Sequence, residues 1–186
     1  MKKKFLPLIL LFILTFSGFL STQIILNKIN LNAESGDPEK QKHALYESHF
    51  QTLKLTTTKK STIELKNEKA PIIVLNFWAS WCVPCLKEFP SLVEFQNKYK
   101  DQVRVIGING DAENSAELIE KTEKKYKLNF ESVEDPYERI SESFLIRTYP
   151  VSIIYHKGKV LYVNKKMHNF MDSDFLSMID RALKAN

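Results

Sequence analysis

The feature that most limits how this chain can fold is the apolar run PIIVLNFW at residues 71–78, which is followed after three residues by Cys82 and Cys85. The run is rich in β-branched residues, and Asn76 is its one strongly polar member. A strand with one solvated face alternates apolar and polar residues, whereas a nearly continuous apolar run is typical of a strand buried on both faces. The sequence therefore predicts an α/β domain in which other elements cover this strand on two sides.

The segments around this strand alternate between strand and helix patterns. Alternation followed by a terminal hairpin predicts a mixed central sheet covered by helices on both faces, with an N-terminal β-hairpin extension. The predicted domain covers residues 49–186. Its expected elements are a hairpin from 50–55 and 63–65, the strand 71–78, a helix after Cys82, a strand at 103–109, a helix at 118–126, a strand at 130–133, a helix at 137–144, a hairpin within 150–164 and a closing helix capped by Asp172 or Ser173.

Residues 1–26 predict one transmembrane anchor helix. Lys2, Lys3 and Lys4 precede an uncharged stretch from Phe5 to Leu26, which as a helix would be roughly 33 Å long and could cross the hydrocarbon core. We expect the segment to stay uncleaved, since no convincing small-x-small cleavage site is present, and a cleaved signal peptide is the alternative. The lysines are expected to remain cytoplasmic, which places the domain outside the cytoplasm. Residues 27–48 are polar and are expected to form a linker.

The charge of the chain argues against a nucleic-acid partner. The net charge is +5, but the three lysines ahead of the predicted anchor supply three of these charges. The remainder is nearly neutral and has no run of Lys and Arg interleaved with aromatic residues, as a phosphate-binding surface would require.

Cys82 and Cys85 are the only cysteines of the chain. A structural zinc site needs four ligands, and the four histidines are scattered without the spacing of a second ligand pair. A disulfide between these cysteines would close a very short loop and would add little stability. We therefore expect no metal and no other cofactor, and we interpret the pair as a redox couple.

The position of the pair also favours thiol-disulfide exchange. If the strand ends near Trp78, the next helix begins at or just after Cys82, where free N–H groups and the helix dipole stabilise a thiolate. We expect this attacking thiolate to be exposed. Cys85 lies one turn further on the same side of the helix, and Pro84 fits the first turn because its missing N–H costs nothing there.

Three stretches of the chain, FWASWCVPC, CLKEFP and RTYPVSIIYHKGKV, resemble the thioredoxin superfamily. With the anchor and the hairpin, they are most similar to the ResA/TlpA branch of membrane-anchored extracytoplasmic thiol-disulfide oxidoreductases. The resemblance implies a thioredoxin fold, with Cys82 as nucleophile, Cys85 as resolving thiol and Pro150 as a cis-proline packed against them. Trp78 is expected in the core, whereas the expected substrate-docking residues are Trp81, Val83, Pro84 and Tyr149.

Asn76 and Glu88 are the two positions that bear on which residue accepts the proton of the resolving thiol, Cys85. Cytoplasmic thioredoxins carry a buried aspartate on this strand, and the amide of Asn76 cannot replace it as a proton carrier. Glu88 follows Cys85 by three residues, on the same side of the helix, and ResA-like proteins have a glutamate at the matching position. We expect Glu88 to act as acid and base with a pKa raised by apolar surroundings, the alternative being a solvated glutamate. The turn with Asp111 and Glu113 is expected to be solvated.

The resemblance further implies the partners. The chain is expected to be a single-pass protein of the bacterial cytoplasmic membrane that reduces disulfides of extracytoplasmic proteins, with apocytochrome c as substrate and a membrane thiol carrier of the DsbD/CcdA type as electron source. An oxidase or isomerase for secreted proteins would use the same residues, because direction depends on reduction potential and partner. A copper-handling chaperone of this fold is a further alternative, although that class usually spaces its cysteines more widely and adds a histidine. A non-catalytic interaction domain would not need Cys82, Cys85 and Pro150 intact.

Overall fold

The computed structural model describes residue 16, residues 18–23 and residues 37–185. The chain divides into residues 1–42 and residues 43–186, and the second unit holds the sheet and the cysteines. Most of the predicted anchor, residues 1–26, lies outside the described residues. Within the described ranges, no helix combines the length and apolar character needed to cross a membrane.

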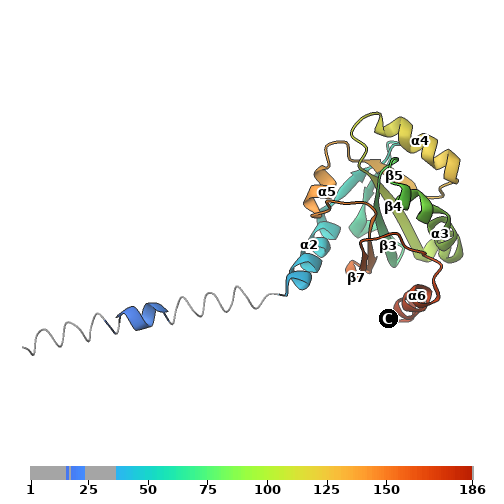
Figure 1. The fold of residues 1–186 in the computed structure, drawn as a ribbon. Helices are drawn as coiled ribbons and strands as arrows, with labels where there is room; N and C mark the ends of the chain where they lie inside the picture. The colour runs from blue at the N-terminus through green and yellow to red at the C-terminus, as the bar shows by residue number, and fades with distance from the viewer. Residues whose placement is uncertain (1–15, 17, 24–36, 186) are drawn as a thin grey trace, which may run out of the picture. The chain divides into compact units, whose positions relative to one another are not determined.

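Five strands form the central sheet: β3 (Ile72–Trp78), β4 (Val103–Asn109), β5 (Glu131–Glu134), β6 (Val151–His156) and β7 (Lys159–Asn164). Their order in the sheet is β5-β4-β3-β6-β7, and Figure 1 labels β5, β4, β3 and β7. The central strand β3 runs parallel to β4 and antiparallel to β6. β5 is parallel to β4, and β7 is antiparallel to β6. The sheet is therefore mixed, as the sequence predicts, and every residue of β3 is buried.

Helices cover both faces of this sheet. One face carries α3 (Val83–Tyr99), α4 (Ser115–Tyr126) and α6 (Ser173–Lys184), which lie on the same side in Figure 1. The other face is covered by α5 (Arg139–Ser143), by α2 (Pro38–Thr52) from His43 onward and by the hairpin of β1 (Lys54–Thr56) and β2 (Thr62–Glu64). The N-terminal hairpin and the two-sided arrangement confirm the predicted fold class within the described residues.

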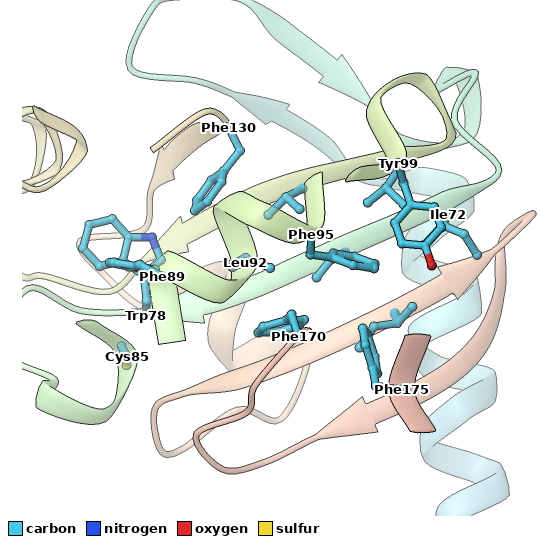
Figure 2. Packing of buried hydrophobic residues seen from close by; sticks show 14 of the residues in the cluster. Ile72, Trp78, Cys85, Phe89, Leu92, Phe95, Tyr99, Phe130, Phe170 and Phe175 are labelled. Carbon is cyan, nitrogen blue, oxygen red and sulfur yellow. The ribbon is translucent and has the colours of Figure 1, made fainter. Parts of the chain in front are cut away.

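The core on the α3 face is dominated by aromatic side chains (Figure 2). Trp78 meets Phe89 edge to face at 5.2 Å between ring centroids, and Phe95 lies 5.3 Å from Phe175. Aromatic pairs of this kind contribute about 0.5–1.5 kcal/mol beyond the burial of their surface. Cys85 lies at the end of this cluster that holds Trp78 and Phe89, so the packing that stabilises the sheet also encloses the resolving cysteine.

Helix α2 is a difference from the sequence prediction. It begins at Pro38, inside the segment 27–48 that was expected to be a linker, and it ends at Thr52, inside the segment 50–55 that was expected to be a strand. Tyr46 is fully buried, and its backbone carbonyl accepts a hydrogen bond from the hydroxyl of Tyr155 at 3.1 Å. Tertiary packing of two aromatic residues, Tyr46 and Phe50, thus stabilises a helix that is otherwise polar.

The closing helix α6 starts where the sequence predicts. Asp172 is its N-cap, and one carboxylate oxygen accepts the N–H groups of Asp174 at 3.0 Å and Phe175 at 3.2 Å. This cap satisfies two N–H groups that the helix itself leaves without partners.

Candidate active site

Cys82 and Cys85 lie at the N-terminus of α3, directly after the loop that leaves β3. They are joined by a disulfide. Cys82 is the N-cap of the helix, and its Sγ accepts a hydrogen bond from the backbone N–H of Cys85 at 3.2 Å. Pro84 lies in the first turn and is exposed. The predicted position of the pair at a helix N-terminus is confirmed, and the free N–H groups there are available to a thiolate after reduction.

The exposure of Cys82 differs from the expectation of an accessible thiolate. In the disulfide form its exposed fraction is 4%, against 0% for Cys85. The residues on either side of it are open instead, with 67% of Trp81 and 58% of Val83 exposed, while Trp78 is fully buried as predicted. Cys82 is thus the more accessible cysteine, but in this form its helix-capping position keeps the sulfur close to the backbone.

Pro150 follows a cis peptide bond from Tyr149 and is itself buried. It immediately precedes β6, whose first residue, Val151, pairs with Phe77 of β3. Because this is the last pair of the register, Pro150 lies near the end of β3 from which the cysteine loop leaves. The cis bond therefore lies at the same edge of the sheet as the disulfide.

Tyr149 connects this proline to the surface around the cysteines. Its ring meets Trp81 edge to face, with 6.0 Å between centroids. Its hydroxyl lies 3.4 Å from Ser141 Oγ and 3.5 Å from a carboxylate oxygen of Glu138. A Cβ added to Gly110 would lie only 2.0 Å from this same hydroxyl. Tyr149 thus fills a gap that exists because residue 110 has no side chain.

Glu88 is buried, with 1% of its surface exposed. Its Oε1 accepts a hydrogen bond from Asn76 Nδ2 at 2.7 Å, and its Oε2 accepts one from the backbone N–H of His168 at 3.2 Å. Burial raises the pKa of Glu88 to about 7, while the two hydrogen bonds act in the opposite direction. A solvated helix glutamate is thereby excluded. On α3, Glu88 follows Cys85 by three residues, so the two side chains are neighbours on one helix face.

Asp111 was expected to be solvated, and this prediction is wrong. It is 3% exposed, and its carboxylate accepts hydrogen bonds from Ser80 in the cysteine loop and from Asn109 Nδ2. The sequence carried one usable signal: Asp111 follows a predicted buried strand, at the same edge of the sheet as the cysteine loop. Sequence reasoning also missed His168, whose contribution is a backbone N–H and therefore leaves no mark on residue type.

No group of three or more His, Cys, Asp or Glu side chains in the part of the chain that the structure describes is arranged to hold a metal ion. The cysteines are engaged with each other. What the arrangement can do chemically is exchange disulfides, using two sulfurs, a helix N-terminus and a buried carboxyl whose pKa lies near neutrality.

A mixed five-stranded sheet, a Cys-x-x-Cys disulfide at a helix N-terminus and a cis-proline at the same edge define a thioredoxin-fold thiol-disulfide oxidoreductase. The chain belongs to the AhpC/TSA family, whose model matches residues 47–163.

Curated relatives agree with this class. The chain is 30% identical over 131 residues to the thioredoxin-like protein YneN of Bacillus subtilis, covering 66% of this chain and 75% of that protein. It is 30% identical to the thiol-disulfide oxidoreductase ResA of Bacillus subtilis, covering 67% of this chain and 70% of ResA. The match to ResA of Bacillus cereus reaches 36% identity but spans only 57% of that protein and 53% of this chain.

Solved structures show the same fold. StoA from Bacillus subtilis superposes with a TM-score of 0.54 at 27% identity, covering 63% of this chain and 89% of StoA. A Chlorobium tepidum protein described as a thiol:disulfide interchange protein of the DsbE type superposes with a TM-score of 0.62 at 26% identity, covering 70% of this chain and 92% of that structure.

Proposed function

We propose that this oxidoreductase reduces disulfides in proteins outside the cytoplasm, where residues 1–26 hold it at the membrane. The observation that carries the proposal is the disulfide of Cys82 and Cys85 at the N-terminus of α3, with the buried carboxyl of Glu88 on the same helix. Cys82 is the nucleophile, because it caps the helix and is the more accessible of the two cysteines.

The first half of the reaction joins enzyme and substrate. In the reduced protein the Cys82 thiolate attacks one sulfur of a substrate disulfide. A mixed disulfide forms between Cys82 and that sulfur, and the other substrate sulfur leaves as a thiolate. The exposed side chains of Trp81, Val83 and Pro84, together with Tyr149 next to Pro150, form the proposed contact surface for the substrate chain.

The second half releases the substrate. Glu88 takes the proton of Cys85, and the resulting thiolate attacks Cys82 Sγ. The disulfide between the two cysteines forms again, the second substrate sulfur leaves, and the substrate has gained the two electrons that the protein has lost. The proton on Glu88 passes to the departing sulfur or to solvent. A carboxyl with a pKa of about 7 can both accept and release this proton at neutral pH.

The proposed substrate is apocytochrome c, whose haem-attachment cysteines must be reduced before ligation, and the proposed electron donor is a membrane thiol carrier of the DsbD/CcdA type. The support for these partners is the similarity to relatives of the ResA type. Because each relative is matched over only part of its length, substrate and donor are the points that experiment must test.

Trapping tests the substrate. We expect the Cys85→Ser variant of the full chain, incubated in reduced form with disulfide-bonded apocytochrome c, to form a covalent adduct that dithiothreitol releases. The Cys82→Ser variant is the matched control and should form none. Failure of Cys85→Ser to capture apocytochrome c, while it captures other disulfide-bonded secreted proteins, would count against the cytochrome c assignment.

The reduction potential tests whether the protein reduces or oxidises its substrates. A potential of the Cys82–Cys85 couple near the value of about −270 mV found for thioredoxin supports a reductase. A potential near about −120 mV, the value of a strong oxidant, would instead favour the oxidase alternative.

A further inference from the structure

The hydrogen bonds around Glu88 continue into a buried polar cluster formed by Asn76, Glu88 and Ser152. Asn76 lies on β3 and Ser152 directly opposite it on β6. Asn76 Nδ2 donates to Glu88 Oε1 at 2.7 Å and to Ser152 Oγ at 2.9 Å. The exposed fractions of the three residues are 0%, 1% and 1%, so water does not replace these contacts.

The amide of Asn76 presents its donor side to the carboxyl. Both hydrogens of Nδ2 are used, whereas Oδ1 is buried and has no hydrogen-bond partner in the described part of the chain. A buried acceptor without a partner is unfavourable, because it has given up its hydrogen bonds to water and gained none in the protein. The opposite orientation would place Oδ1 against the Glu88 carboxylate, where two acceptor oxygens would face each other without a hydrogen between them. The orientation therefore favours the ionised form of Glu88, while the side-chain carbonyl of Asn76 is left without a hydrogen bond.

Few other titratable groups lie near Glu88 to influence its ionisation. The helix α3 offers Cys85 and the exposed Lys87, β3 and β6 offer no titratable group at the contact, and the segment before α6 offers His168. His168 donates through its backbone, while its imidazole packs against Phe170 and Phe175. Among the side chains described, the donor that opposes the burial of Glu88 is thus Asn76.

We propose that Asn76, held in orientation by Ser152, is a positioning residue that keeps the buried Glu88 carboxyl able to ionise and so able to take the proton of Cys85. The proposal rests on the acid and base role of Glu88 given above. An amide on the strand and a carboxyl on the helix then act as one unit. In this proposal Asn76 takes no part in the sulfur exchange and does not bind the substrate. It acts only through its hydrogen bond to Glu88.

The test follows the resolving step of the reduced full chain with the reporter disulfide 5,5′-dithiobis(2-nitrobenzoate). Attack by Cys82 releases one coloured thiolate, and resolution by Cys85 releases the second. The pH midpoint of the second phase reports the proton transfer. We expect Asn76→Leu, which removes the donor at similar volume, to raise this midpoint by about one to two pH units and to slow the second phase about tenfold at pH 7.

Two further variants keep the test decisive. Ser152→Ala leaves the amide in place but frees its orientation, and it should raise the midpoint by a smaller amount even if Asn76→Leu does not fold. Ser132→Ala removes another buried serine, on β5, and should leave the midpoint unchanged. Titration of the ¹³C-labelled Glu88 carboxyl carbon by NMR should show the same upward shifts in the oxidised protein.

The outcomes separate this inference from the proposed function. If Glu88→Gln leaves the pH profile of the second phase unchanged, Glu88 does not carry the proton and the proposed role of Glu88 fails with the inference. If Glu88→Gln abolishes that pH dependence but both Asn76→Leu and Ser152→Ala match the unsubstituted chain, the role of Glu88 stands and the inference about Asn76 is overturned.

Discussion

The carboxylate of Asp111 accepts hydrogen bonds from both the backbone N–H and the hydroxyl of Ser80, two residues ahead of Cys82. The loop after β4 therefore fixes the loop after β3, and the anchoring group lies 31 positions away in sequence. A cysteine that caps a helix depends on the path of the chain before it, so this contact bears on the geometry of the disulfide as well as on stability.

Removing this carboxylate should destabilise the domain. Asp111→Ala leaves the part-buried Ser80 N–H and the buried Asn109 amide without their acceptor, and we expect the free energy of unfolding to fall by about 2–4 kcal/mol. Asp111→Asn keeps one acceptor oxygen and should lose less. Urea unfolding of the oxidised protein measures both changes. The control is Glu113→Ala, an exposed acid in the same loop, and equal stability of Asp111→Ala and this control would contradict the anchoring role.

The buried Glu88 should make stability depend on pH. Its pKa in the folded state is about 7, above the value of 4.5 for a free glutamate, so the folded state binds the proton more tightly than the unfolded state does. The stabilisation is complete below about pH 4.5 and is lost as pH rises through about 7. Between pH 5 and pH 8 we expect the unsubstituted chain to lose about 2–3 kcal/mol more than Glu88→Gln.

The measurement is urea unfolding of the oxidised proteins at both pH values. Glu94→Gln, at an exposed position of the same helix, should retain the pH dependence of the unsubstituted chain. Parallel pH profiles for Glu88→Gln and the unsubstituted chain would show that Glu88 ionises in its usual range.

Gly110 should not tolerate a side chain while Tyr149 is present. A Cβ at residue 110 would lie 2.0 Å from the hydroxyl and 2.6 Å from Cζ of Tyr149, so the ring must leave its place beside Trp81. We expect Gly110→Ala to lower the free energy of unfolding by about 1–3 kcal/mol. The double variant Gly110→Ala/Tyr149→Val should be more stable than the sum of its single variants predicts, because the smaller side chain removes the collision. Additive thermal or urea unfolding data would argue that the two residues do not compete for this space.

The N-cap of α6 offers a simpler measurement. Asp172→Ala removes the acceptor of two backbone N–H groups, and we expect a loss of about 1 kcal/mol in the free energy of unfolding. Asp172→Ser should restore most of it, since a serine hydroxyl also caps helices. A Ser variant no more stable than the Ala variant would indicate that the acid acts in another way, such as through its charge on His168.

The sequence predicts those parts of the fold and the site that depend on a pattern within one short segment. The buried strand is visible in the run 71–78, and the helix start is visible in the spacing of Cys82, Pro84 and Cys85. Helical geometry links Glu88 to Cys85, and the resemblance to ResA-like proteins, which have a glutamate at the matching position, favours the acid and base role over a solvated glutamate. Helix α2 escaped prediction because Tyr46 and Phe50 are its only buried residues, which is too few to form a recognisable stripe.

The parts that escaped prediction depend on pairings across the sheet. Asp111 reaches Ser80 only because β4 lies parallel to β3, and Ser152 reaches Asn76 only because β6 lies antiparallel to β3 in one particular register. A shift of that register by one residue would turn Ser152 to the other face of the sheet. No local pattern in the sequence specifies which residues meet in this way.

The contacts of Glu88 also imply an order of events as the chain is made. Synthesis runs from the N-terminus, so both cysteines and Glu88 emerge before Ser152 and before His168, which closes the second hydrogen bond to the carboxyl. A chain that ended before β6 would carry both thiols but would lack Ser152 and the His168 N–H that bonds to Glu88. The newly made polypeptide therefore holds both thiols before the hydrogen bonds around Glu88 can be complete.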